Sequence, residues 1–195
     1  MRMRTSIGMS WIALLFLSAA IPLLGTTVPK MDLAALVDGS DRVLQGRVET
    51  IEVQMDSRLN LPFTLVRVRV DDPICQRPAP GVRCSASAGD RRQTVFLKHV
   101  GGRVPNSPVA VSASGIPQFK SGDNVILFLK DLGDGTNFQV VGLAQGKYDV
   151  VNETAVSSIS GVDLVDSKTG KVLPNGFVES APVDAFKARI RELVK

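Results

Sequence analysis

The sequence predicts a mainly β protein: a small OB-like β-barrel with a short N-terminal helix, a C-terminal hairpin and an amphipathic C-terminal helix. Three observations carry this expectation. Apolar and polar residues alternate in several short runs, and Gly and Pro separate those runs. A helical repeat of apolar residues occurs only near the two ends of the expected domain.

Residues 1–27 have the layout of a secretory signal. Arg2 and Arg4 give a basic start, an apolar stretch runs from Trp11 to Leu24, and polar residues follow. Pro22 interrupts this stretch, which is shorter than the roughly 20 apolar residues that span a bilayer. We expect a cleaved signal and a secreted or periplasmic protein without a stable membrane span. An uncleaved membrane anchor is the alternative.

The remaining residues, 28–195, are enough for a single domain, in which residues 163–195 supply the C-terminal hairpin and helix. The formal charge of +4 becomes about +2 once Arg2 and Arg4 are removed. A nearly balanced surface gives no electrostatic basis for nucleic-acid binding, and few aromatic residues are present to stack on bases. We therefore expect no nucleic-acid partner.

The first elements are expected in quick succession. A short helix follows Asp32, which can cap it, and ends near Gly39. Strands are expected at 43–53, 63–70 and 94–100, and the second of these alternates cleanly between valine and arginine.

Gly46 interrupts the first of these strands. Leu44 and Val48 share one parity, whereas Ile51 and Val53 share the other, so the inward face changes sides along the strand. We expect a bend or bulge there, which glycine permits.

Later elements follow from the same rules. Residues 124–130 are apolar on both faces, as in a strand covered on both sides, and further strands are expected in "FQVVGL" and "QGKYDVV". "SKTG" predicts a hairpin turn in which Gly170 is left-handed. The last helix is expected to have Ser180 as its cap and Pro182 in its first turn. Its apolar face would hold Val183, Phe186, Ile190 and Leu193.

The only two cysteines, Cys75 and Cys84, are expected to form a disulfide in an oxidising compartment. A redox pair or a metal site is the alternative, although the spacing is not C-x-x-C and no second ligand pair accompanies it. His99 is the only histidine, and its parity matches that of Val95 and Leu97, which predicts a structural role. No motif predicts catalytic residues, a bound metal or a cofactor.

Three stretches resemble the barrel of the netrin-like family, which includes the tissue inhibitors of metalloproteinases: "LVDGSDRVLQGRVETIEV", "TLVRVRV" and "SGDNVILFL". The resemblance covers roughly Leu36 to Val150 and implies a secreted OB-type barrel that binds protein partners. Those inhibitors chelate the protease zinc through an N-terminal cysteine, and this chain has no cysteine before Cys75. The stretch from Gly115 to Leu129 is also similar to secreted bacterial proteins without an assigned function.

These observations favour a non-catalytic binding module whose partner is a secreted or cell-surface protein. The predicted partner-binding loop consists of Met55, Asp56, Ser57, Arg58, Leu59 and Asn60. One alternative is a small secreted hydrolase in which His99 acts with a serine or an acid. The other is an inhibitor of a secreted protease that presents residues 55–62 and the segment near Val28 as one ridge.

Overall fold

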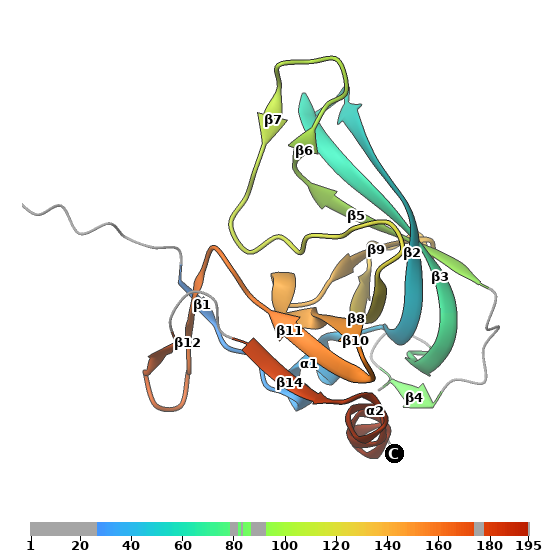
Figure 1. Ribbon diagram of the computed structural model, residues 1–195, viewed down its shortest axis with the longest axis vertical. Helices are drawn as coiled ribbons and strands as arrows, with labels where there is room; N and C mark the ends of the chain where they lie inside the picture. Colours follow the sequence, from blue (N-terminus) through green and yellow to red (C-terminus); the bar gives the residue numbers. More distant parts are fainter. Residues whose placement is uncertain (1–26, 79–81, 83, 87–92, 174–177, 195) are drawn as a thin grey trace, which may run out of the picture.

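The structure is a computed structural model that describes residues 27–78, 82, 84–86, 93–173 and 178–194 (Figure 1). The predicted signal lies outside the described residues except for Thr27, so it stays a prediction. The mainly β fold with a small barrel and a C-terminal helix is confirmed.

Five strands form a closed ring in the order β2-β3-β5-β9-β8, and β8 pairs back onto β2. All neighbours in the ring are antiparallel except β5 and β9, which are parallel. The strands are β2 (Arg42–Asp56), β3 (Leu61–Gln76), β5 (Thr94–Val100), β8 (Asn124–Asp131) and β9 (Asn137–Val140). Closure leaves no open edge where the ring is complete.

The long strand β2 bends as the sequence predicts. Its register against β3 is irregular at three places, namely between Val43 and Leu44, between Gln45 and Gly46, and between Val48 and Thr50. The last irregularity lies where the inward face changes sides: Val48 is buried in the barrel, and Ile51 packs against the same cluster. The bulges therefore let one strand follow the curve of the barrel.

Strand β8 is the wall shared by two cores. Its residues 125–129 are completely buried, which confirms the expectation of a strand covered on both faces. Val125, Leu127 and Leu129 point into the barrel, while Ile126 and Phe128 belong to a second cluster. That second cluster is completed by residues of both helices, so the helices cover one side of the barrel.

Three further strands extend the sheet beyond β8, in the order β10-β11-β14. They are β10 (Lys147–Val151), β11 (Thr154–Ser158) and β14 (Val178–Pro182). Helix α1 (Leu33–Gly39) has Asp32 as its cap, as predicted, with the Asp32 carboxylate accepting a hydrogen bond from the Ala35 amide. Figure 1 shows α1 and α2 (Val183–Leu193) at the lower side of the molecule.

The start of α2 corrects the sequence expectation. Ser180 is not a helix cap but lies in β14, opposite Val156, and Pro182 is the capping residue without a side-chain hydrogen bond. Val183, Phe186 and Ile190 are buried as predicted, whereas Leu193 is 38% exposed. The strand pairing of residues 178–182 thus delays the helix to Val183.

The remaining elements are short. The predicted C-terminal hairpin is formed by β12 (Asp163–Val165) and β13 (Val172–Leu173), and Gly170 in its turn has φ 68°. Strand β1 (Thr27–Pro29) adds to β12 in parallel. The others are β4 (Ser85–Ala86), β6 (Gly102–Arg103), β7 (Ala110–Val111) and the 3₁₀ helix η1 (Leu143–Gly146).

Candidate functional site

The predicted partner-binding loop forms the tip of the β2–β3 hairpin. Met55 and Asp56 end β2, and residues 57–60 make a tight turn into Leu61 of β3. We call residues 55–61 the hairpin tip. Figure 1 shows the tip and the β6–β7 hairpin at the same end of the molecule, far from the helices.

Asp56 holds the turn in one conformation. Its Oδ1 accepts hydrogen bonds from the backbone N–H groups of Arg58 and Leu59, at 2.9 and 3.1 Å. These two bonds, helped by Lys98, hold the pKa of the Asp56 carboxyl below its usual value. Asn60 then adopts φ 50°, a left-handed conformation that asparagine tolerates. The tip is therefore preorganised for contact.

Apolar side chains are exposed on this rigid tip. Leu59 is 61% exposed, and Met55 and Leu61 are exposed at nearly 40%. Leu61 was not among the six residues of the predicted partner-binding loop, although the ridge of the inhibitor alternative, residues 55–62, includes it. Single exposed apolar residues are common on protein surfaces, whereas several of them on one fixed turn make that turn a candidate contact site.

Lys98 of β5 contacts both the hairpin tip and the adjacent strand β3. Its Nζ lies 4.5 Å from the centre of the Phe63 ring and 3.9 Å from a carboxylate oxygen of Asp56. A cavity of about 350 Å³ opens beside these residues and is lined by tip residues 55–58 together with Gln54 and Leu65. The tip thus presents exposed apolar side chains next to a cavity that is lined mostly by polar residues.

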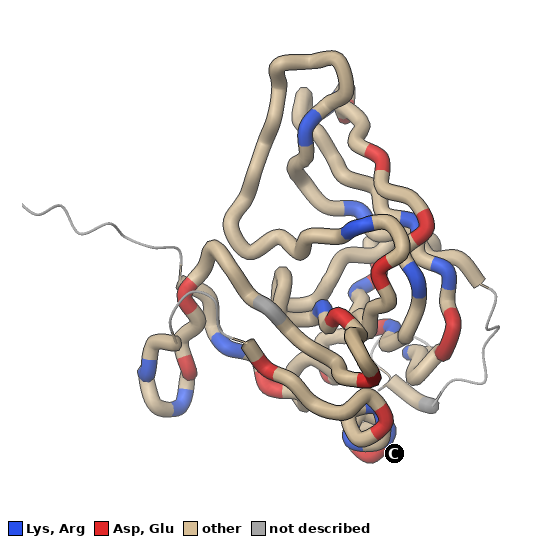
Figure 2. Tube along the Cα trace, viewed as in Figure 1, with Lys and Arg blue, Asp and Glu red and all other residues tan. Residues whose placement is uncertain are grey.

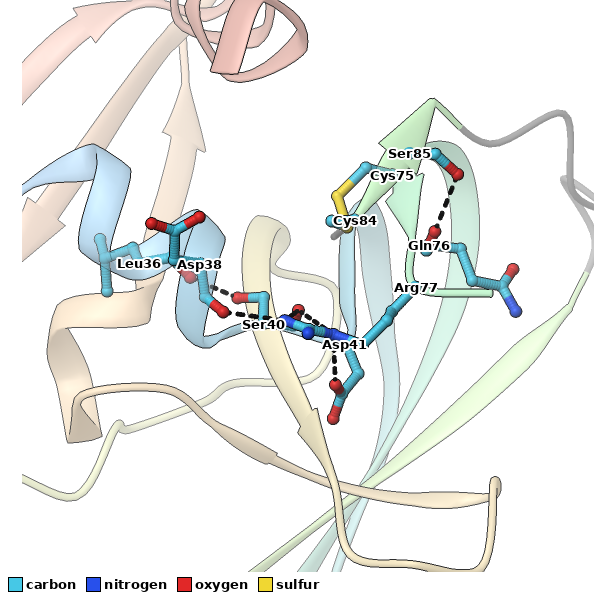
Figure 3. Close-up of a disulfide and its surroundings, with 9 residues drawn as sticks. All are labelled: Leu36, Asp38, Ser40, Asp41, Cys75, Gln76, Arg77, Cys84 and Ser85. Carbon is cyan, nitrogen blue, oxygen red and sulfur yellow. Dashed lines mark hydrogen bonds and ion pairs between the residues drawn. A yellow bond between two sulfur atoms is a disulfide. The ribbon is translucent and has the colours of Figure 1, made fainter. Parts of the chain in front are cut away.

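The predicted disulfide is confirmed, and its surroundings indicate a structural role (Figure 3). Both cysteines are buried, and they pack in the cluster that contains Leu36 and Val37 of α1. The Arg77 side chain, two residues after Cys75, donates to the backbone oxygens of Asp38 and Ser40 and pairs with Asp41 at 2.8 Å. The disulfide region therefore anchors α1 and the start of β2 to the end of β3.

His99 lies in a different place, at one end of the barrel interior. It lines a cleft of about 340 Å³ between β5 and the segment 110–119, and its ring centre is 6.0 Å from that of Phe119. Burial lowers the pKa of His99 below its ordinary value. Neither a serine nor a carboxylate among the described residues hydrogen-bonds its ring. Within the described residues, His99 therefore lines a cleft but has no hydrogen-bonded partner of the kind that the hydrolase hypothesis requires.

The ridge expected of a protease inhibitor does not form. Val28 lies in β1, which pairs with β12 beside the C-terminal hairpin. Figure 1 shows β1 at the left of the molecule, beside β12 and away from the upper end that holds β6 and β7. Val28 packs in a separate small cluster with Ile159, Val162 and Leu164, none of which belongs to residues 55–62, so the structure does not bring the two segments into one ridge.

The charges and the possible metal ligands single out no other site. Figure 2 shows acidic and basic residues interspersed along the described chain. Within the described ranges, His, Cys, Asp and Glu side chains nowhere gather in groups of three that could hold a metal ion. Neither helix in this part of the chain has the length and apolar character of a membrane span.

Comparisons of the chain with protein-family models, with curated proteins and with solved structures found no match.

Proposed function

We propose that the protein is a secreted or periplasmic, non-catalytic binding module with an OB-like barrel, and that it contacts a secreted or cell-surface protein through the hairpin tip. The observation that carries this proposal is the combination of a fixed turn and an exposed apolar side chain at its apex. A partner that buries Leu59 gains apolar contact without ordering the loop, because Asp56 has already fixed it.

Two further observations support the compartment and the barrel type. The N-terminal segment has the layout of a secretory signal, and the disulfide suits an oxidising compartment. The ring of five strands with one parallel pair is compatible with an OB-type barrel, to which the netrin-like resemblance also points. The zinc-chelating mechanism of the metalloproteinase inhibitors is not part of the proposal, since the cysteine it needs is missing.

The test is affinity capture from the native secreted fraction with three baits: the wild-type protein, Leu59→Glu and Val172→Glu. Val172 is the matched control, because it is an exposed apolar residue, at 53%, on the remote β12–β13 hairpin. We expect wild type and Val172→Glu to recover equal amounts of the same partner. Leu59→Glu should recover at least tenfold less of it, because a charge then stands at a binding hot spot. Equal recovery with all three baits would show that the tip is not the contact site.

A further inference from the structure

The wall of the barrel has a gap beside the end of β5. β5 and β9 pair only at Phe96 and Leu97, after which β9 leaves β5 and pairs with β8 through Val140 and Leu129. The last residues of β5, Lys98–Val100, keep β3 on one side. On the other side no strand of the described chain pairs with them. A sheet edge is therefore open within an otherwise closed barrel.

The outward backbone groups at this edge can be assigned from the pairing with β3. The Gly101 N–H donates to the Pro62 carbonyl oxygen at 2.8 Å, so it points toward β3. Successive residues of a strand direct their N–H groups to opposite sides, so the Val100 N–H points away from β3 toward the gap. Unpaired donors and acceptors of this kind are a template for another strand.

A groove of about 370 Å³ runs along the same edge. Lys98, His99 and Val100 form one wall, and Leu132, Val140 and Leu143 belong to the opposite side. Most of the lining is apolar, and Lys98 is the only charged residue in it. Leu132 is 45% exposed although it faces this groove, which leaves apolar surface uncovered.

Leu143, on the opposite side of the groove, has a constrained backbone conformation. Its φ is 61°, a left-handed conformation that leucine rarely adopts. The following residue holds it there, because the Ala144 N–H donates to the Gly115 carbonyl oxygen at 2.8 Å. Backbone conformations of this kind persist only where the surroundings fix them, and they are often found at ligand sites.

We propose that this groove binds an extended segment of a partner polypeptide, which adds as a strand beside Lys98–Val100. One apolar side chain of the segment would pack against Leu132 and Val140, and an acidic side chain next to it would approach Lys98. An apolar small molecule would fill the groove but leave the backbone groups of the edge without partners, whereas a peptide strand satisfies both. The groove adjoins the proposed contact at the hairpin tip and shares Lys98 and Phe63 with the cavity there, but Leu59 does not line it.

The test uses random heptapeptides displayed on phage, selected on the full disulfide-bonded protein. A selected peptide is then synthesised twice, once unmodified and once with its backbone amides N-methylated, and both forms are titrated. Val100→Pro removes the outward N–H and leaves the Gly101 bond to β3 intact, whereas Val100→Thr is the matched control that keeps the N–H. Leu59→Glu separates this site from the hairpin tip.

We expect peptides with alternating apolar residues and an acidic residue to be selected. Val100→Pro should weaken binding about fivefold or more relative to Val100→Thr, as loss of one hydrogen bond predicts, and N-methylation should abolish binding. Leu59→Glu should bind the peptide like wild type. The proposal is overturned if no peptide is enriched, or if the N-methylated peptide binds equally well, which would indicate an apolar pocket only. If Val100→Pro does not fold, the affinities of the unmodified and the N-methylated peptide for the wild-type protein decide between the two outcomes.

Discussion

Gly46 of β2 lies directly against the backbone oxygen of Arg69 on β3, so close that a Cβ at position 46 would overlap that oxygen and lie 2.9 Å from Cγ1 of Val68. The register of β2 against β3 also shifts at this point. Glycine is therefore required by the close approach of two backbones inside the curved barrel wall, and its φ is not in the left-handed region.

Replacing Gly46 with valine should destabilise the protein by about 2–3 kcal/mol or more, because the side chain must displace either β3 or the buried Val68. Urea unfolding followed by circular dichroism measures this. Gly135→Ala is the control: a Cβ there meets nothing within 4 Å, and only the positive φ of 69° opposes it. The control should cost about 1 kcal/mol, and equal losses for the two variants would contradict the packing argument.

The turn between β10 and β11 offers a stabilising change. Val151 pairs with Thr154, and the two residues between them, Asn152 and Glu153, have φ 47° and 61°. Glycine suits the second position of such a turn, so Glu153→Gly should raise the free energy of unfolding by about 0.5–1 kcal/mol. Asn152→Gly should change stability little, because asparagine already tolerates this conformation. A loss of stability in Glu153→Gly would show that the glutamate contributes contacts of its own.

His99 should make stability depend on pH. Burial lowers its pKa in the folded state below the ordinary value of 6.5, so the unfolded chain takes up the proton first. Neutral His99 therefore makes its full contribution to the free energy of unfolding above pH 6.5. This contribution is lost as the pH falls from 6.5 toward the pKa of His99 in the folded state.

The unfolding free energy of wild type, measured from pH 8 to pH 5, should fall more steeply below pH 6.5 than that of His99→Gln. The difference in slope should be at most about 1.4 kcal/mol per pH unit. Parallel curves for the two proteins would mean that the His99 ring is not buried in its neutral form.

Local patterns in the sequence predict the barrel strands well, because alternating valines indicate that every second residue faces the core. Val66, Val68 and Val70 are all buried, and Arg67 and Arg69 between them are exposed. The bulge between Val48 and Thr50 was also predictable, since the change of parity between Val48 and Ile51 requires one. The disulfide followed from the presence of two cysteines together with the oxidising compartment that the predicted signal implies.

Strand β14 was missed because its stability comes from pairing with β11 and not from its own composition. "VESAP" has no apolar alternation, and Pro182 suggested a helix start. Proline is acceptable here because it ends a strand that lies last in the sheet order. The parallel contact between β5 and β9, and with it the groove beside Val100, joins segments far apart in the chain. No local pattern encodes such a contact.

The central claim, that the hairpin tip is the partner-binding surface, is tested most directly by site-specific photo-crosslinking. A photoreactive amino acid replaces Leu59 in one protein and Val172 in another, and both are irradiated in the native secreted fraction. We predict one dominant crosslinked protein from position 59 and none from position 172. Identical adducts from both positions, or no adduct from position 59, would contradict the claim.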